Sequence, residues 1–184
     1  MPLLAKEFSC PRCRDKEDLE NTCFSQSFSQ YEGLIKRVIK HYKFQGDRTL
    51  HILFCDLFEL MLEKYKQESY TLVPVPCSLS SYKRRGWDQM KVISDEMKRR
   101  GYPVFEAISR ENRDIELKKM AKSERDETID GLYYLDKKEV SRPSQSLLII
   151  IDDVITTGTT LRYIRDMLYS VYGGQIIGMS IVMD

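Results

Sequence analysis

Residues 147–160 read LLIIIDDVITTGTT, an apolar run that ends in two adjacent carboxylates and a loop of small, hydroxyl-bearing residues. Five consecutive apolar residues are too few to cross a membrane and too uniform for a strand with one face in water. We therefore predict a central strand of a parallel sheet at residues 147–151. The carboxylates then follow at its C-terminal end, where ligands bind in open α/β sheets. This stretch is the predicted site.

The loop after the carboxylates has the chemistry of a phosphate site. It offers four hydroxyls and consecutive backbone N–H groups at the N-terminus of the next helix, which together favour a phosphate monoester. Gly158 permits the positive φ angle that a tight turn requires. The residues of this predicted phosphate loop are Thr156, Thr157, Gly158, Thr159 and Thr160.

Asp152 and Asp153 precede the phosphate loop. Two carboxylates would be repelled by a phosphate in the same cradle, so we expect them to accept hydrogen bonds from neighbouring sugar hydroxyls. A ribose with a 5′-phosphate satisfies both halves of the segment.

Other phosphate-binding families fit the stretch poorly. A haloacid-dehalogenase-like phosphatase needs a second acid two residues after its nucleophile, where this chain has Val154. The Gly-Lys-Ser/Thr of a P-loop and the GxGxxG of a dinucleotide fold are both missing. One alternative stays open, a buried strand that simply ends in a capped turn, because Asp and Thr are favoured in turns and caps of any α/β protein.

The same residues resemble the phosphoribosyl pyrophosphate (PRPP) motif of the type I phosphoribosyltransferases, an apolar strand followed by two acidic residues and a Thr/Gly loop. The resemblance implies that Asp152 and Asp153 are catalytic residues that contact the ribose 2′- and 3′-hydroxyls, and that residues 156–160 bind the 5′-phosphate. Mg²⁺ is the implied cofactor. Because Mg²⁺ is usually held through substrate phosphates with one or two carboxylates, we expect it to arrive bound to PRPP.

Two further segments resemble the ComF-type competence family, a branch of the phosphoribosyltransferase-like proteins. Residues 73–90 (VPVPCSLSSYKRRGWDQM) are similar to the family's VPVP…KRGFNQ signature, and residues 31–47 (YEGLIKRVIKHYKFQGD) to its YxGxLKxLIxxxKFxGD stretch. The resemblance covers residue 31 to the C-terminus. Asp88 departs from it, since the family usually has Asn there. Of a later Gln…Arg-x-x-Asn pattern, Arg125 fits but the Asn position is occupied by Thr128.

Basic side chains are concentrated between residues 83 and 125, with thirteen Lys or Arg against eight Asp or Glu. Such a surplus suits pyrophosphate and would also suit nucleic acid. By family analogy, Lys83, Arg84 and Arg85 bind the pyrophosphate of PRPP, although a charge run is also typical of a solvated face.

A second basic stretch corresponds in position to the flexible loop that closes over the sugar in type I enzymes. A surface helix is the other interpretation of this stretch. Its candidate residues are Lys118, Lys119, Lys122 and Arg125.

The N-terminal cysteines suggest a zinc site that is incomplete. Cys10 and Cys13 form a Cys-x-x-Cys knuckle, and ComF-type proteins commonly begin with paired knuckles that resemble a zinc ribbon. Cys23 is a candidate third ligand, but Gln26 stands where its partner is expected. A structural zinc site needs four donors. Bound Zn²⁺ and a degenerate zinc-ribbon remnant therefore both remain open.

Length and composition fit one modest domain. The chain has 184 residues, is 42% hydrophobic and carries a net charge of +1, enough for one substantial core. We expect a degenerate Cys-containing segment at residues 1–30 and a phosphoribosyltransferase-like domain at 31–184. No stretch has the length of a transmembrane helix and residues 1–8 lack the order of a secretory signal, so we expect a cytosolic protein.

Apolar periodicity predicts a doubly wound parallel sheet flanked by helices, because strands and helices alternate. A small helical or zinc-ribbon-remnant region precedes it. Residues 77–86 are predicted to be a loop. The predicted helices cover residues 31–43, 50–65, 87–100 and the stretch after the phosphate loop, and the predicted strands cover 71–76, 104–108, 132–135, 147–151 and 175–182. The same periodicity predicts which helical residues share an apolar, inward face: Leu34, Ile35, Val38, Ile39 and Tyr42 in the first helix, Met90, Ile93 and Met97 in the third, and Leu161, Ile164, Leu168 and Val171 in the last.

Two functions fit these observations. The first is a PRPP-dependent phosphoribosyltransferase whose acceptor the sequence does not identify. The second is a non-catalytic module of the same fold that acts in DNA uptake, as the family resemblance implies, and binds PRPP, a nucleotide or single-stranded DNA. The acceptor and the oligomeric state cannot be read from the sequence.

Overall fold

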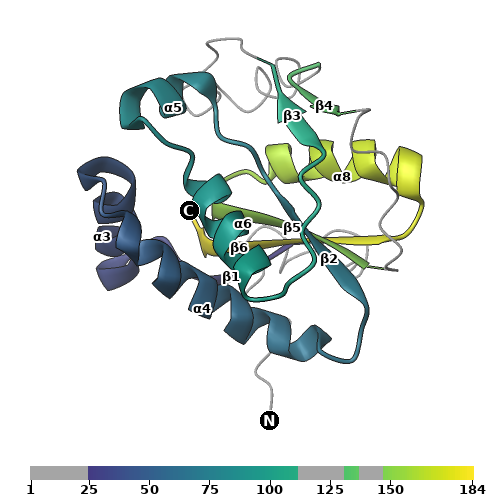
Figure 1. Cartoon of the computed structure of the whole chain (residues 1–184), viewed down its shortest axis with the longest axis horizontal. Helices are drawn as coiled ribbons and strands as arrows, with labels where there is room; N and C mark the ends of the chain where they lie inside the picture. The colour runs from purple at the N-terminus through teal and green to yellow at the C-terminus, as the bar shows by residue number, and fades with distance from the viewer. Residues whose placement is uncertain (1–24, 112–130, 137–146) are drawn as a thin grey trace.

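The computed structural model describes residues 25–111, 131–136 and 147–184 (Figure 1). Its centre is a four-stranded sheet in the order β1-β6-β5-β2, in which every neighbouring pair is parallel. The strands are β1 (Ser25–Gln30), β2 (Tyr70–Pro74), β5 (Leu147–Ile155) and β6 (Gln175–Met183). Helices cover both faces of the sheet (Figure 1). This confirms the predicted α/β class and is consistent with a type I phosphoribosyltransferase-like fold.

Strand β5 is buried on both faces, as its uninterrupted apolar sequence predicts. It pairs with β6 on one edge and with β2 on the other. Its side chains alternate between two hydrophobic cores: Ile149 and Ile151 belong to the first, and Leu148 and Ile150 to the second. All four are at most 3% exposed.

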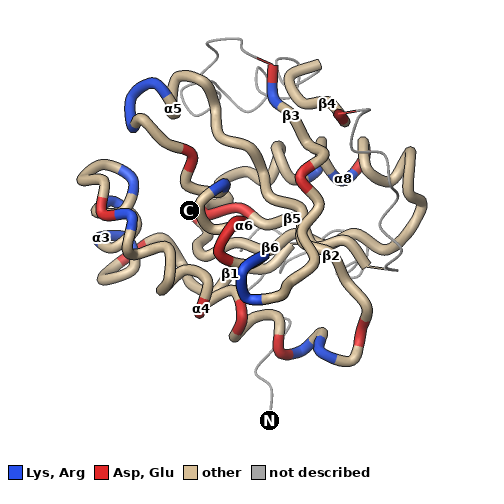
Figure 2. Tube along the Cα trace, viewed as in Figure 1, with Lys and Arg blue, Asp and Glu red and all other residues tan. Residues whose placement is uncertain are grey.

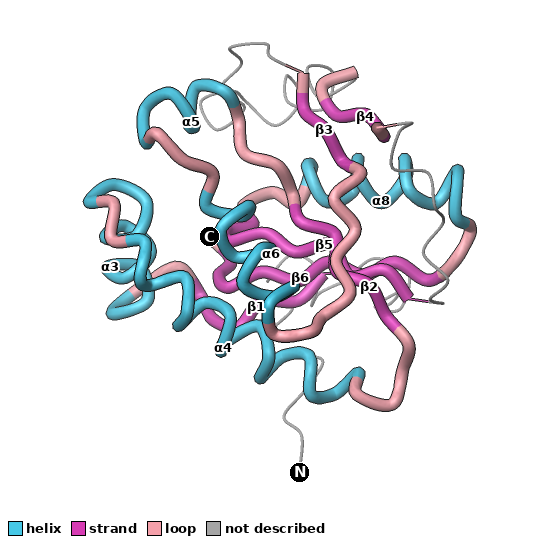
Figure 3. The backbone as a smooth tube through the Cα atoms, in the orientation of Figure 1, coloured by secondary structure: helices cyan, strands magenta, loops and turns pink. Residues whose placement is uncertain are grey.

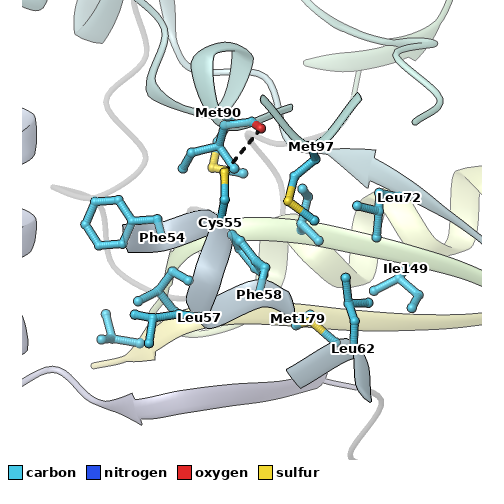
Figure 4. Packing of buried hydrophobic residues seen from close by; sticks show 14 of the residues in the cluster. Phe54, Cys55, Leu57, Phe58, Leu62, Leu72, Met90, Met97, Ile149 and Met179 are labelled. Atoms are coloured by element: carbon cyan, nitrogen blue, oxygen red, sulfur yellow. Dashed lines mark hydrogen bonds between the residues drawn. The ribbon is translucent and has the colours of Figure 1, made fainter. Parts of the chain in front are cut away.

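The first core lies beneath α3 (Gly33–Lys40), α4 (His51–Leu62) and α6 (Gln89–Arg99). Figure 4 shows Phe54, Phe58 and Leu62 of α4 packed with Met90 and Met97 of α6. The predicted inward face of α6 is therefore confirmed. Two short 3₁₀ turns, Arg48–Leu50 and Glu63–Tyr65, flank α4.

Cys55 is a core thiol of this cluster. Its sulfur lies 3.7 Å from the backbone carbonyl of Ile93, to which it donates a hydrogen bond (Figure 4). Burial raises the pKa of Cys55 to about 12. At neutral pH it stays protonated and packs like a small apolar residue.

The second core lies between the sheet and α8 (Thr159–Tyr172). Leu161, Ile164 and Leu168 of α8 are buried as predicted, whereas Val171 is 38% exposed. A short antiparallel pair, β3 (Ile108–Arg110) and β4 (Tyr133–Leu135), also packs on this side. The parallel sheet therefore carries a separate two-stranded ribbon beside the end of β5.

Helix α3 differs from its prediction because it changes pitch. It stops at Lys40 and continues as one π-helical turn, His41–Gln45, which ends at Gly46 with φ +74°. The wider turn brings two consecutive side chains, Tyr42 and Lys43, into the interior. Leu34, predicted to face the core, is instead 68% exposed. Turns of this kind are frequent at functional sites.

The predicted loop after β2 contains a helix, α5 (Leu79–Arg85), which Figure 3 shows between β2 and α6. The Ser78 hydroxyl caps it by accepting a hydrogen bond from the Ser81 N–H at 3.2 Å. The strand predicted at residues 104–108 is also different, since Val104 only bridges Leu72 and the regular strand begins at Ile108.

Strand β1 was not predicted. Its sequence, SQSFSQ, has one apolar residue, and it pairs with the outer edge of β6. Its buried Ser27 hydroxyl lies 2.6 Å from the Ser180 hydroxyl of β6.

None of the helices in the described part of the chain is long and apolar enough to cross a membrane.

Candidate functional site

A pocket of about 260 Å³ opens where β2 and β5 end. Small-molecule pockets commonly enclose about 300–1,000 Å³, so this one suits a compact ligand. Its walls come from the β2–α5 segment, the start of α6, the β3–β4 ribbon and the β5–α8 loop. The charged residues that line it are Arg84, Arg85, Arg110, Asp152 and Asp153.

The predicted phosphate loop forms one wall of this pocket, with all five of its residues in the lining. Gly158 has φ +71° and is the N-cap of α8. The Arg162 guanidinium donates to the Thr157 carbonyl at 3.0 Å and to the Thr159 hydroxyl at 3.3 Å. A side chain of α8 thus fixes the loop that precedes the helix, and adds a positive charge beside it.

The two carboxylates lie on opposite sides of β5. Asp153 is 5% exposed, and its Oδ2 lies 2.7 Å from the Nζ of Lys43 in the π-helical turn. Asp152 is half-buried and accepts a hydrogen bond from the Asp153 N–H at 2.8 Å. Burial and the nearby Asp152 carboxylate raise the pKa of Tyr133, on β4, to about 12. Both aspartates line the pocket, but they approach it from different faces of the strand.

The three basic residues predicted to bind pyrophosphate, all at the end of α5, differ in their position relative to the pocket. Arg84 and Arg85 line the pocket, whereas Lys83 is exposed and is not part of the lining. The guanidinium of Arg84 lies 5.9 Å from the ring centroid of Phe44, and Arg85 donates a hydrogen bond to the Gln89 side chain. Figure 2 shows the three basic residues as a blue run at the end of α5.

Three pocket-side residues were missed from the sequence: Lys43, Arg110 and Tyr133. Arg110 and Tyr133 face each other across the β3–β4 ribbon, with Arg110 Nη1 donating to the Tyr133 hydroxyl at 3.0 Å. They place a cation on the pocket wall that the ribbon forms next to the phosphate loop, since the Tyr133 side chain also hydrogen-bonds that of Thr160. Lys43 was treated only as part of a helix. No pattern within one segment singles out these contacts, because each depends on a distant part of the chain.

Asp88 occupies the position where the resemblance implies Asn, and its carboxylate has a clear structural role. Its Oδ1 accepts from the Met90 and Lys91 N–H groups at 2.8 and 3.1 Å, which caps α6, and its Oδ2 accepts from the Cys77 N–H at 3.1 Å. Burial and the Asp88 carboxylate raise the pKa of Cys77 to about 12. Cys77 lines the pocket as a neutral thiol at pH 7, and thiols of that kind are poor nucleophiles.

Metal sites can be judged only in part. Within residues 25–111, 131–136 and 147–184, no group of three or more His, Cys, Asp or Glu side chains could hold a metal ion. A Mg²⁺ ion carried by ligand phosphates needs only one or two carboxylates, and Asp152 and Asp153 line the pocket. The other predicted site residues lie outside the described ranges, and their roles stay predictions: Cys10, Cys13, Cys23, Lys118, Lys119, Lys122, Arg125 and, at the departing Asn position, Thr128.

The chain was also compared with known proteins. No family model matches it. It is 28% identical to "Competence protein ComFC" of Streptococcus pneumoniae (strain ATCC BAA-255 / R6), over 88% of the chain and 74% of that protein. It is 27% identical to "Competence protein ComFC" of Bacillus subtilis (strain 168), over 76% of the chain and 55% of that protein. Both relatives bear out the predicted resemblance to the ComF-type competence family. The chain therefore spans about half of the Bacillus relative and three quarters of the Streptococcus one.

The three segments that resemble the ComF-type family meet beside the pocket. Tyr42 and Lys43 come from the first segment, Trp87 and Gln89 from the second, and Asp153 from the third. The Tyr42 hydroxyl donates to the Gln89 carbonyl at 3.1 Å, and its ring packs edge-on against Trp87 at 4.7 Å. Lys43 links the first segment to the third through its ion pair with Asp153. The ComF-type resemblance thus corresponds to one contiguous structural unit.

We predict that Asp88→Asn lowers the free energy of unfolding by about 1 kcal/mol, because one side-chain atom would become an N–H₂ donor facing a backbone N–H donor. Asp88→Ala should cost about 1–3 kcal/mol, since it removes the helix cap and the contact with Cys77. Urea denaturation measures both. Asp95→Asn, an exposed substitution on α6, is the control and should change stability by less than about 0.5 kcal/mol. Equal stability of Asp88→Asn and the wild type would contradict the assigned hydrogen bonds.

Proposed function

We propose that the chain binds PRPP in the β2–β5 pocket and transfers its 5-phosphoribosyl group to an acceptor. The observation that supports this most directly is the convergence of a Thr/Gly loop at a helix N-terminus, two carboxylates and three arginines around one compact pocket. Phosphate monoester, sugar hydroxyls and pyrophosphate are the three chemical groups that these elements would recognise.

In this proposal the phosphate loop holds the 5′-phosphate, with its shape fixed by Arg162. Asp152 and Asp153 accept hydrogen bonds from the ribose hydroxyls. A carboxylate offers about four acceptor sites, so the contact between Asp153 and Lys43 is compatible with an additional bond to the sugar. Arg84, Arg85 and Arg110 would face the pyrophosphate.

The reaction would proceed by attack of an acceptor on the anomeric carbon as the bond to pyrophosphate breaks, through a transition state with oxocarbenium character. No covalent enzyme nucleophile is required. Arginines positioned at the leaving pyrophosphate stabilise its developing charge, and each such contact is worth about 3 kcal/mol. Mg²⁺, when bound with PRPP, would supply further neutralisation of the leaving group. The pocket lining does not identify the acceptor.

A second candidate is a non-catalytic module of DNA uptake that binds a nucleotide or single-stranded DNA through the same pocket. The names of the two relatives favour a role in competence, and Arg84, Arg85 and Arg110 give the pocket a basic wall. Under both candidates a cytosolic location is proposed.

Pyrophosphate release distinguishes the two candidates. The chain is incubated with PRPP, Mg²⁺ and a panel of nucleobases and other amines, and pyrophosphate is measured by a coupled assay. Release with one acceptor supports the enzyme. Binding of single-stranded DNA whose affinity falls steeply with salt, without release of pyrophosphate, supports the second candidate.

Asp152→Asn is predicted to weaken binding of ribose 5-phosphate about tenfold, since an ionised hydrogen-bond acceptor to a sugar hydroxyl is lost. Asp152 is half-buried, so the fold should tolerate the amide. Asp153→Asn is a poorer probe, because it would leave the Lys43 ammonium buried opposite an amide and cost about 3–5 kcal/mol. Calorimetry with Mg²⁺ present measures the affinity, and an unchanged value for Asp152→Asn would count against the sugar contact.

Gly158→Ala is predicted to weaken phosphate binding several-fold, and Gly173→Ala is its matched control. Both glycines cap α8 with positive φ, +71° and +64°, so each substitution should cost about 1 kcal/mol of stability. Only at Gly158 would the new Cβ meet a neighbour, Arg162 Nη1 at 3.3 Å, while nothing lies within 4 Å at Gly173. Titration with PRPP should separate them. Equal affinities of the two variants would refute the assignment of the phosphate loop.

A further inference from the structure

Lys43 is buried beside the pocket without being part of its lining. Its side chain is 8% exposed and that of its partner, Asp153, is 6% exposed, with 2.7 Å between Nζ and Oδ2. Lysine is almost never this buried unless it is paired. Because an apolar pair of similar size is often as stable as a buried ion pair, or more so, stability alone gives no reason for an ion pair at these two positions.

The backbone that carries Lys43 is anchored by the residue that precedes it. The preceding residue, Tyr42, is fully buried and packs edge-on against Phe54 and Trp87 at 4.8 and 4.7 Å. Gly46 ends the π-helical turn in the left-handed conformation. Lys43 therefore reaches Asp153 from a rigid position, and such support is what keeps a binding group in a productive orientation.

Asp153 is the link between Lys43 and the pocket, since it contacts the lysine and also lines the cavity. An ammonium at 2.7 Å favours the ionised carboxylate, which can only accept hydrogen bonds. The same carboxylate is close enough to Tyr31 and Tyr42 to contribute, after burial, to raising the pKa of each. Lys43 places its ammonium directly against the Asp153 carboxylate and so balances its charge.

We infer that Lys43 is a positioning residue for sugar recognition: it orients the Asp153 carboxylate toward the hydroxyls of a ribose phosphate without touching the ligand itself. This inference rests on the proposed function and assigns a role to the π-helical turn of the ComF-type segment at residues 31–47. A lysine that only fastened this turn to β5 would support folding equally well, so the test must separate stability from sugar recognition.

The test compares two ligands that share a phosphate monoester, ribose 5-phosphate and methyl phosphate, of which only the first has ribose hydroxyls. Their affinities are measured by titration of the wild type and of Lys43→Met, Lys43→Gln, Asp153→Asn and Lys43→Met/Asp153→Asn. Lys40→Met is the matched control, because Lys40 is exposed on the preceding helix. Chemical denaturation of each variant records stability separately.

The wild type should bind ribose 5-phosphate at least about tenfold more tightly than methyl phosphate. Lys43→Met should lower this preference several-fold while leaving methyl phosphate affinity within about twofold, and Lys40→Met should keep the wild-type preference. In the Asp153→Asn background, Lys43→Met should have no further effect on the preference, because it acts through that carboxylate. Lys43→Gln removes the positive charge that faces Asp153 but keeps a polar side chain, so it should also reduce the preference, and it carries the measurement if Lys43→Met does not fold.

Two results would overturn the inference. If Lys43→Met, or Lys43→Gln in its place, loses stability but keeps the wild-type ribose preference, Lys43 is only structural and the proposed function stands. If the wild type binds neither ligand, the proposed function fails and the inference fails with it.

Discussion

The burial of β5 on both faces decides where everything else in the pocket can lie. Along residues 147–151 each side chain enters one of two apolar cores, so an unpaired polar group there would be costly. Charged side chains become possible only where the strand emerges, at Asp152 and Asp153. The Thr/Gly loop and α8 follow immediately, and β2 ends beside them. The position of the pocket is thus a consequence of where apolar burial stops.

Asp153 shows this consequence most clearly, because it lies two residues before the end of β5 and is only 5% exposed. A carboxylate at that depth requires a cation, and Lys43 supplies it from a segment more than a hundred residues away in sequence. The π-helical turn, the buried Tyr42 and the Trp87 ring can be understood as the support for that cation. The phosphate loop, β5 and the π-helical turn are therefore connected by direct contacts. They are built from the three segments that resemble the ComF-type family.

Much of this arrangement could be predicted from the sequence, because apolar periodicity reports burial. The central strand, the inward face of α6 and three of four residues on α8 were correctly predicted from it. Strand β1 was missed, since a Ser/Gln-rich edge strand has almost no apolar signal. Helix α5 was missed for the same reason, because its residues are mostly serine and basic side chains.

The contacts around the pocket were less predictable. Lys43 turns inward through a change of helical pitch, which a regular 3.6-residue pattern does not detect, and Arg110 meets Tyr133 only because two short strands pair. The sequence also suggested that the two adjacent aspartates act together on the sugar. In the structure they occupy opposite sides of the strand, since neighbouring residues of a strand point to opposite faces, and Asp153 forms an ion pair with the buried Lys43.

The central claim is that this pocket holds a ribose 5-phosphate group, and a crystal structure of the chain with ribose 5-phosphate and Mg²⁺ tests it most directly. The account predicts phosphate oxygens about 3 Å from backbone N–H groups of residues 156–160, and ribose hydroxyls hydrogen-bonded to the Asp152 and Asp153 carboxylates. A ligand bound elsewhere, or a sugar in this pocket that contacts neither aspartate, would contradict it.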